Sequence, residues 1–205
     1  MTDYHARTGN FAAVDPVGPH VRVVRLASLA LLDVGRGEPD VRGWPIVTNE
    51  GHRVGRVRDL LVELATRRVR YLDVALDLAL ADGRPDLRVA IPIGCARAGT
   101  RRNQVNVRCA TREQFRHAPR HSAELLTLDD EIVLRRFFTS GPRMLVVAAD
   151  GVDFYAGPDF DERSFWSVRR AGREELPYLE LLSSREVKVK RPVSTAHDDD
   201  LRAEA

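Results

Sequence analysis

Short β-branched runs separated by turn residues dominate the middle of the chain, from Val41 to Cys109. Apolar runs lie at 41–47, 53–64, 69–76, 87–93 and 104–109, with clusters of Gly, Asn and Asp between them. This spacing is typical of a compact antiparallel sheet or a small barrel. The sequence therefore predicts a mainly β fold with short helices (α+β), built on a small antiparallel β-barrel.

Turn and breaker residues refine this prediction. The Gly-terminated segment 49–51 and the segment 99–103 have the chemistry of hairpin connections. Leu60 and Leu61 interrupt the alternation of their run, and a bulge or bend there would restore it. Pro92 lacks an N–H group and indicates an edge position or a strand end. In the run 69–76 the alternation is regular and places Tyr71, Asp73 and Ala75 on one face.

Two helices are predicted after the barrel. Thr111 and Gln114 have the spacing of a capping box and open a helix that ends before Pro119. Thr127 opens a second helix, and its first turn carries three consecutive acidic residues at 129–131. Acidic side chains are favoured there by the helix dipole.

The pattern divides the chain into four parts. Residues 1–37 form an irregular arm with one strand at 21–26, and residues 38–110 form the barrel. Residues 111–150 hold the two helices and a strand at 144–148. Residues 151–205 are an aromatic and charged extension, in which Asp159 caps a short helix to Val168, a strand follows at 186–190, and the acidic end is disordered.

The charge distribution distinguishes the barrel from its flanks. Residues 41–110 carry 13 Arg against seven acidic residues, whereas residues 1–40 and 111–205 are mildly acidic. Exposed arginines bind carboxylates and phosphates, so the barrel face is a candidate surface for acidic partners or anionic headgroups. A solvated strand exterior is an equally weighted alternative. The arginines in question are Arg53, Arg56, Arg67, Arg68, Arg70, Arg101 and Arg102.

Several function classes find no support in the sequence. It has no Gly-rich phosphate loop, no metal-ligand spacing and no nucleophile motif, so we expect no enzyme, no cofactor, no metal and no small-molecule or nucleic-acid ligand.

Cys95 and Cys109 make neither a disulfide framework nor a metal site; both fall in predicted strands, where a free Cys behaves as a small buried hydrophobe. No signal peptide and no apolar run near the roughly 20 residues of a membrane span is present. We therefore expect a soluble cytoplasmic protein.

The barrel stretch resembles the PRC-barrel, the small domain shared by the H subunit of photosynthetic reaction centres and the ribosome-maturation protein RimM. The resemblance is carried by 41–47, 54–60, 70–74 and 91–93. The order of 104–107, 111–115, Pro119 and 124–132 further resembles the H subunit, without its transmembrane helix. The continuation 111–150 has no counterpart in RimM-type chains.

The H subunit implies a role for the acidic run. There, surface acids and histidines help relay protons towards a quinone, and Glu124, Asp129, Asp130 and Glu131 match that run. Capping acids beside solvated histidines are the favoured interpretation, and the proton relay is the alternative.

The aromatic extension is a second candidate surface for a partner, since aromatic residues and Arg dominate interface hot spots. Its alternative role is to pin the extension to the chain's own barrel. The residues are Phe160, Arg163, Phe165, Trp166, Arg169, Arg170 and Tyr178.

Together these features predict a non-catalytic structural subunit. It would dock on the cytoplasmic face of a photosynthetic reaction-centre or light-harvesting complex, peripheral to the inner membrane. The alternative is a stand-alone PRC-barrel adaptor of stress-response or RNA-processing type.

Overall fold

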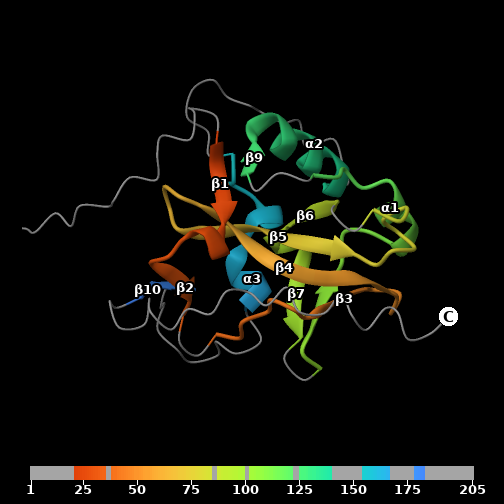
Figure 1. The fold of residues 1–205 in the computed structure, drawn as a ribbon, viewed down its shortest axis with the longest axis horizontal. Helices are drawn as coiled ribbons and strands as arrows, with labels where there is room; N and C mark the ends of the chain where they lie inside the picture. The colour runs from red at the N-terminus through yellow and green to blue at the C-terminus, as the bar shows by residue number, and fades with distance from the viewer. Residues whose placement is uncertain are drawn as a thin grey trace, which may run out of the picture.

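A computed structural model describes residues 21–35, 38–84, 87–99, 102–121, 125–139, 154–166 and 178–182 (Figure 1). Its strands are β1 (Val21–Arg25), β2 (Leu32–Val34), β3 (Pro45–Thr48), β4 (Arg53–Glu63), β5 (Arg68–Leu76), β6 (Arg88–Pro92), β7 (Ala96–Gly99), β8 (Gln104–Val107), β9 (Leu125–Thr127) and β10 (Leu179–Leu181). The α-helices are α1 (Arg112–Arg116), α2 (Leu128–Phe138) and α3 (Glu162–Trp166), and the 3-10 turns are η1 (Leu26–Ser28), η2 (Ile93–Cys95) and η3 (Pro158–Phe160). The prediction of a mainly β chain with short helices is confirmed.

The main sheet is open, so the prediction of a closed antiparallel barrel is wrong. The strands run in the order β6-β5-β4-β3-β8-β7, and β1 joins β4 and β9 beside this path. The β3–β8 pair is parallel, whereas the other pairs are antiparallel. Among the described strands no ladder joins β6 to β7, because the chain leaves β6 at Pro92 and turns through η2 into β7. This is the strand end that Pro92 predicted.

Strand β4 is the longest strand and links the two parts of the sheet. One of its edges pairs with β5, and the other pairs with β3 near Arg56 and with β1 near Val62. The β4–β5 register shifts between Val57 and Asp59 and again between Leu61 and Val62. These irregularities flank Leu60 and Leu61, where the broken alternation predicted a bulge.

Apolar side chains from every described part of the chain join one core. The core includes Leu26, which precedes residues 38–108, as well as Leu134 and Phe138 of α2 and Phe165 of α3. Strand β5 is buried on both faces, so the predicted face of Tyr71, Asp73 and Ala75 does not point to bulk solvent. Helix α2 packs on β6, and α3 packs on η2 and β7.

The predicted capping box at Thr111 is present, and Thr127, the predicted start of the second helix, forms another. The hydroxyl groups of Thr111 and Thr127 accept hydrogen bonds from the N–H groups of Gln114 and Asp130, whose side chains accept from the capping N–H groups in return. The helix expected to begin at Asp159 begins later: the Asp161 carboxylate accepts from the N–H groups of Arg163 and Ser164. Pro158 places Asp159 inside η3 instead, where it cannot cap α3.

Several predictions fall outside the described residues. They are the arm at 1–20, the strands at 144–148 and 186–190, the acidic end, and the side chains of Arg101, Glu124, Arg169 and Arg170. No described helix has the length and hydropathy to cross a membrane.

A fully buried carboxylate on β5, that of Asp73, ties three other segments to this strand. Asp73 lies 3.3 Å from the Arg25 guanidinium of β1 and accepts a hydrogen bond of 3.2 Å from Arg88 of β6. The His121 imidazole lies 3.4 Å from its other oxygen. Its strand neighbour Asp59 accepts from the N–H of Ala27, and burial raises the pKa of Asp59. These charges therefore hold β1 and residue 121 against β5.

Replacing Asp73 with Asn is expected to destabilise the fold strongly, because two half-buried guanidinium groups would lose the charge of this fully buried carboxylate. We expect the free energy of unfolding in urea to fall by about 3–5 kcal/mol. Asp77→Asn is the matched control: Asp77 pairs with Arg53 at 3.4 Å on the surface, where an ion pair contributes about 0–1 kcal/mol. Equal losses in the two variants would contradict this account.

Candidate functional site

The most distinctive arrangement is the junction between residues 38–108 and residues 154–166. We call this junction the seam. The segment crosses the place where the sheet is open, and η3 and α3 pack on η2 (Figure 1). A Cβ atom on Gly94 would collide with the Pro158 carbonyl oxygen and lie 2.7 Å from the carbonyl carbon of Asp159. Because these atoms are backbone, they cannot rotate away as a side chain would. Only glycine permits this close approach at residue 94.

A buried carboxylate fixes the other end of the segment. Glu162 of α3 is 7% exposed and accepts a hydrogen bond of 3.2 Å from the N–H of Val69 in β5. Burial raises the pKa of Glu162 to about 7, against the opposing effect of the Val69 N–H, Arg68 and Arg70. The contact between α3 and β5 therefore contains a group that titrates near neutral pH.

A second buried carboxylate connects α2 to the same segment. Glu131 is fully buried, and one of its oxygens accepts hydrogen bonds from the hydroxyl groups of Tyr71 (2.9 Å) and Tyr155 (2.6 Å). Burial and the Glu131 charge raise the pKa of Tyr71 well above its usual value, so its hydroxyl remains a donor. Strand β5, helix α2 and residues 154–166 meet at this carboxylate.

Arg70 belongs to this arrangement and not to the surface, which corrects its place in the predicted arginine face. It is 4% exposed, and its guanidinium donates to Glu63 at 2.6 Å and 2.9 Å. The same guanidinium stands 4.2 Å from the centre of the Tyr155 ring, within cation–π distance. Leu61 pairs with Tyr71 and the next residue, Val62, pairs with Val69, so the β4–β5 ladder skips Arg70. This register shift turns the Arg70 side chain inward, and simple alternation does not reveal it.

The aromatic residues of the extension are core residues in this structure. Phe160, Phe165 and Trp166 are nearly or fully buried. Phe160 meets the Tyr71 ring edge-on at 5.4 Å, and Trp166 stacks on Tyr178 at 5.9 Å. They pin the extension to its own sheet, so the predicted partner surface of these side chains is corrected to an intramolecular contact. Arg163 is exposed.

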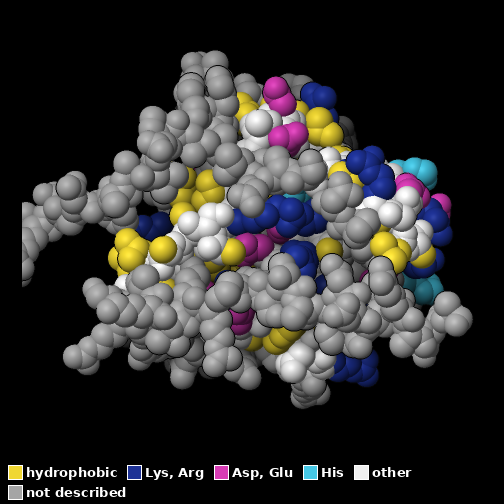
Figure 2. Space-filling view, in the orientation of Figure 1, with side chains coloured by type: hydrophobic (Ala, Val, Ile, Leu, Met, Phe, Trp, Pro, Cys, Tyr) yellow, Lys and Arg dark blue, Asp and Glu magenta, His cyan; other side chains and the backbone are white. Residues whose placement is uncertain are grey.

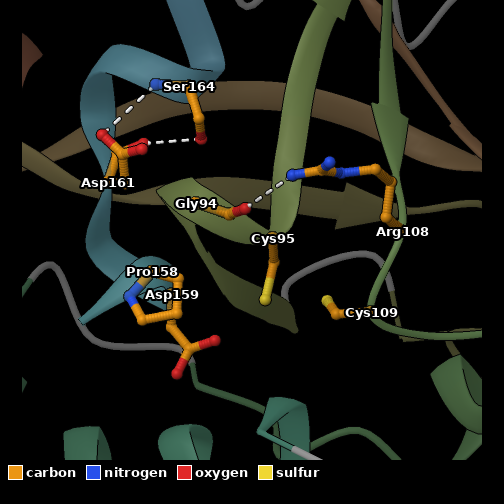
Figure 3. A pocket seen from close by; sticks show the side chains of 8 residues that line it. All are labelled: Gly94, Cys95, Arg108, Cys109, Pro158, Asp159, Asp161 and Ser164. Atoms are coloured by element: carbon orange, nitrogen blue, oxygen red, sulfur yellow. Dashed lines mark hydrogen bonds between the residues drawn. The ribbon is translucent and has the colours of Figure 1, made fainter.

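A pocket of about 310 Å³ opens at the seam (Figure 3). In Figure 3 the sulfur atoms of Cys95 and Cys109 both point into the same space, and Asp159 lies below them. Arg108 donates to the Gly94 carbonyl at 3.2 Å and thereby fixes η2 against the end of β8. The pocket is lined by Gly94, Cys95, Arg108, Cys109, Pro158, Asp159, Asp161 and Ser164.

The two thiols occupy different environments. Cys95 belongs to η2 and is 5% exposed, and Cys109 follows β8 and is half-buried, so neither lies inside a strand as predicted. The neighbouring Cys109 side chain, together with burial, raises the pKa of Cys95. The described residues contain no group of three His, Cys, Asp or Glu that could hold a metal ion.

The acids predicted for proton relay are separated. Asp129 and Asp130 are exposed at the start of α2, and the Asp130 side chain caps that helix. Glu131, in contrast, is buried with the two tyrosines. These positions form no continuous acidic row among the residues described, and Glu124 lies outside that set.

Exposed arginines follow the first half of β4. Arg53, Arg56 and Arg58 alternate with the buried Val54 and Val57. Arg67 and Arg68 are exposed in the next hairpin. Figure 2 shows basic side chains with acidic ones among them where β4 and β5 cross the centre of Figure 1.

Sequence patterns missed the residues that build the seam. Gly94 follows an apolar run without any turn signature, and Glu162 resembles an ordinary first-turn acid. The proximity of Cys95 to Cys109 had a usable signal, because a hairpin at 99–103 brings its two flanks together.

A comparison with protein families adds one finding: residues 38–108 match the PRC-barrel domain. This stretch, from the residues before β3 to the end of β8, is a PRC-barrel domain, which confirms that part of the resemblance. The further resemblance to the reaction-centre H subunit stays a prediction. The seam joins this domain to residues outside it.

Gly94→Ala is expected to loosen the seam, because the added methyl group meets backbone on the opposing segment. Overpacking of this kind costs about 1–3 kcal/mol. Hydrogen exchange should accelerate in the amides of 158–166 more than in β4 and β5. Gly99→Ala is the control, since a Cβ atom there first meets the movable Asn106 side chain. Unchanged exchange in 158–166 would contradict the proposed tight approach.

Glu162→Gln is expected to change how stability depends on pH. The pKa of Glu162 is about 7 in the folded chain against 4.5 in a model peptide, so the folded state binds the proton more tightly. Its contribution is therefore complete below pH 4.5 and is lost as pH rises to 7. The stability advantage of the Gln variant should grow from near zero at pH 4 to about 3 kcal/mol above pH 7. Urea unfolding across this range measures it, and a constant difference would contradict the assignment.

Proposed function

We propose that this chain is a non-catalytic structural subunit that docks on the acidic cytoplasmic face of a photosynthetic reaction-centre or light-harvesting complex. The observation that carries the proposal is the row of exposed arginines on β4, in a PRC-barrel domain whose interior acids are engaged within the chain. A partner in this role is recognised by charge and planar hydrogen bonding, both of which guanidinium groups supply.

The internal contacts explain why a docking role fits better than catalysis. Asp73, Glu131 and Glu162 each accept hydrogen bonds from, or pair with, groups on other segments, and they hold those segments on the sheet. A rigid platform of this kind presents its outer arginines in fixed positions, which lowers the entropic cost of docking.

The resemblance of 104–107, 111–115 and 124–132 to the H subunit supports the photosynthetic assignment in particular. In the structure this continuation becomes β8, α1, β9 and α2, which pack onto the same core. It is thus part of the platform.

Reversing the charge of the arginine row should abolish docking. We expect Arg53→Glu, Arg56→Glu and Arg58→Glu together to weaken co-purification with pigment-binding polypeptides from solubilised native membranes by at least about 100-fold. This estimate assigns about 1 kcal/mol to each near-surface cation. Absorption spectra and mass spectrometry of the eluate measure the loss.

Arg97→Glu, Arg116→Glu and Arg136→Glu provide the charge-matched control, because these arginines are exposed elsewhere on the chain. Equal losses of co-purification in both triple variants would mean that the effect depends on net charge and not on the position of the arginines, which would contradict docking through the β4 row. A colourless eluate from the unaltered protein would overturn the photosynthetic assignment and favour a stand-alone adaptor.

A further inference from the structure

The two cysteines of the seam are neighbours across a strand pair. Ala96 of β7 faces Val107 of β8, and the next rung is the hydrogen bond of 2.9 Å from the Arg108 N–H to the Cys95 carbonyl. Cys95 is therefore part of this last rung, opposite Arg108, and Cys109 is the residue that follows Arg108. With strands about 4.8 Å apart and about 3.3 Å per residue along a strand, this diagonal places the two Cα atoms roughly 6 Å apart, within the range from which disulfides form.

The side chains use this proximity. Figure 3 shows both sulfur atoms directed into the pocket that the two residues line. Two other features hold them there: the Arg108 guanidinium bonds to the Gly94 carbonyl, and Pro158 and Asp159 press on Gly94. Their placement is therefore set by packing at the seam.

We propose that Cys95 and Cys109 form a reversible disulfide, which makes the seam pocket a thiol-oxidation site for small disulfide compounds. This site is independent of the docking function proposed above, because its residues lie at the seam and not on the arginine row.

The reaction proceeds by two exchanges. The Cys109 thiolate attacks one sulfur of a small disulfide R–S–S–R, whose S–S bond breaks and releases one R–S⁻. The Cys95 thiolate then attacks the Cys109 sulfur of the mixed disulfide and releases the second R–S⁻. The protein thiols lose two electrons, the small disulfide gains them, and the two thiol protons pass to the two released thiolates.

The environments of the two residues assign these roles. Cys109 is half-buried and reaches the pocket of about 310 Å³, whereas Cys95 is 5% exposed. Cys109 is therefore the residue that meets the reagent, and Cys95 is the one that resolves the mixed disulfide. Once Cys109 is held in the mixed disulfide, burial still raises the pKa of Cys95, so the second exchange should be the slower one.

The test exposes the reduced, folded protein to hydroxyethyl disulfide and follows it by intact mass and by peptide mapping without reductant. We expect a loss of about 2 Da with a linked Cys95–Cys109 peptide, since two hydrogens leave. The rate of resolution should rise about tenfold per pH unit between pH 7 and pH 9, in proportion to the thiolate fraction of Cys95.

Single serine variants separate the roles. Cys95→Ser should stop at a stable mixed disulfide on Cys109, and Cys109→Ser should remain unmodified until denaturant is added. Circular dichroism verifies that each variant is folded. Because the linked peptide is measured on the unaltered chain, the proposal stays testable even if a variant does not fold.

The disulfide should also raise the melting temperature by about 5 °C, because it closes a short loop at the seam. A stable mixed disulfide on the unaltered protein, a dimer linked through Cys109, or reaction only in denaturant would each overturn the proposal.

Discussion

The close approach of two backbones at Gly94 is the constraint on which the rest of the structure depends. The PRC-barrel domain leaves its sheet open where the chain passes from β6 through η2 into β7. Residues 158–166 cover that opening, and they reach it only because residue 94 has no side chain. Once they are seated, Phe160 and Phe165 complete the apolar core from outside the domain.

Buried charge gives this arrangement its specificity. Apolar contacts alone would allow the extension to slide on the sheet, whereas Glu162 must meet the Val69 N–H and Glu131 must meet two tyrosine hydroxyl groups. Each buried carboxylate carries a desolvation cost that only correctly placed donors offset. For Glu162 that cost appears as a raised pKa, so the stability of the contact depends on pH around neutrality.

The seam and the arginine row give two regions of the molecule different properties, thiol chemistry in the first and exposed positive charge in the second. Arginines on β4 face outward and offer charge to a partner, while the thiols at the seam lie beside the contact that holds the extension. A disulfide there would join η2 to the end of β8 without touching β4. Oxidation is therefore expected to change the rigidity of the platform more than its charge.

Local patterns in the sequence determined the β-rich domain, the strand end at Pro92, the irregularity around Leu60 and Leu61, the capping box at Thr111 and the helix start at Thr127. Each depends on residues close together in the chain, where turn geometry, alternation and capping act directly. The mild basicity of the PRC stretch was equally visible, because it follows from composition alone.

Only the tertiary structure decided which charged and aromatic residues face inward. Arg70 looked like its exposed neighbours until a register shift turned it towards Glu63 and Tyr155. Phe160, Phe165 and Trp166 had the composition of a partner surface, yet the chain's own open sheet takes them up. Gly94, Glu162 and the Cys95–Cys109 pair acquire meaning from segments up to 93 positions away in the sequence. Packing between segments far apart in the sequence selects such contacts, and local sequence patterns do not predict it.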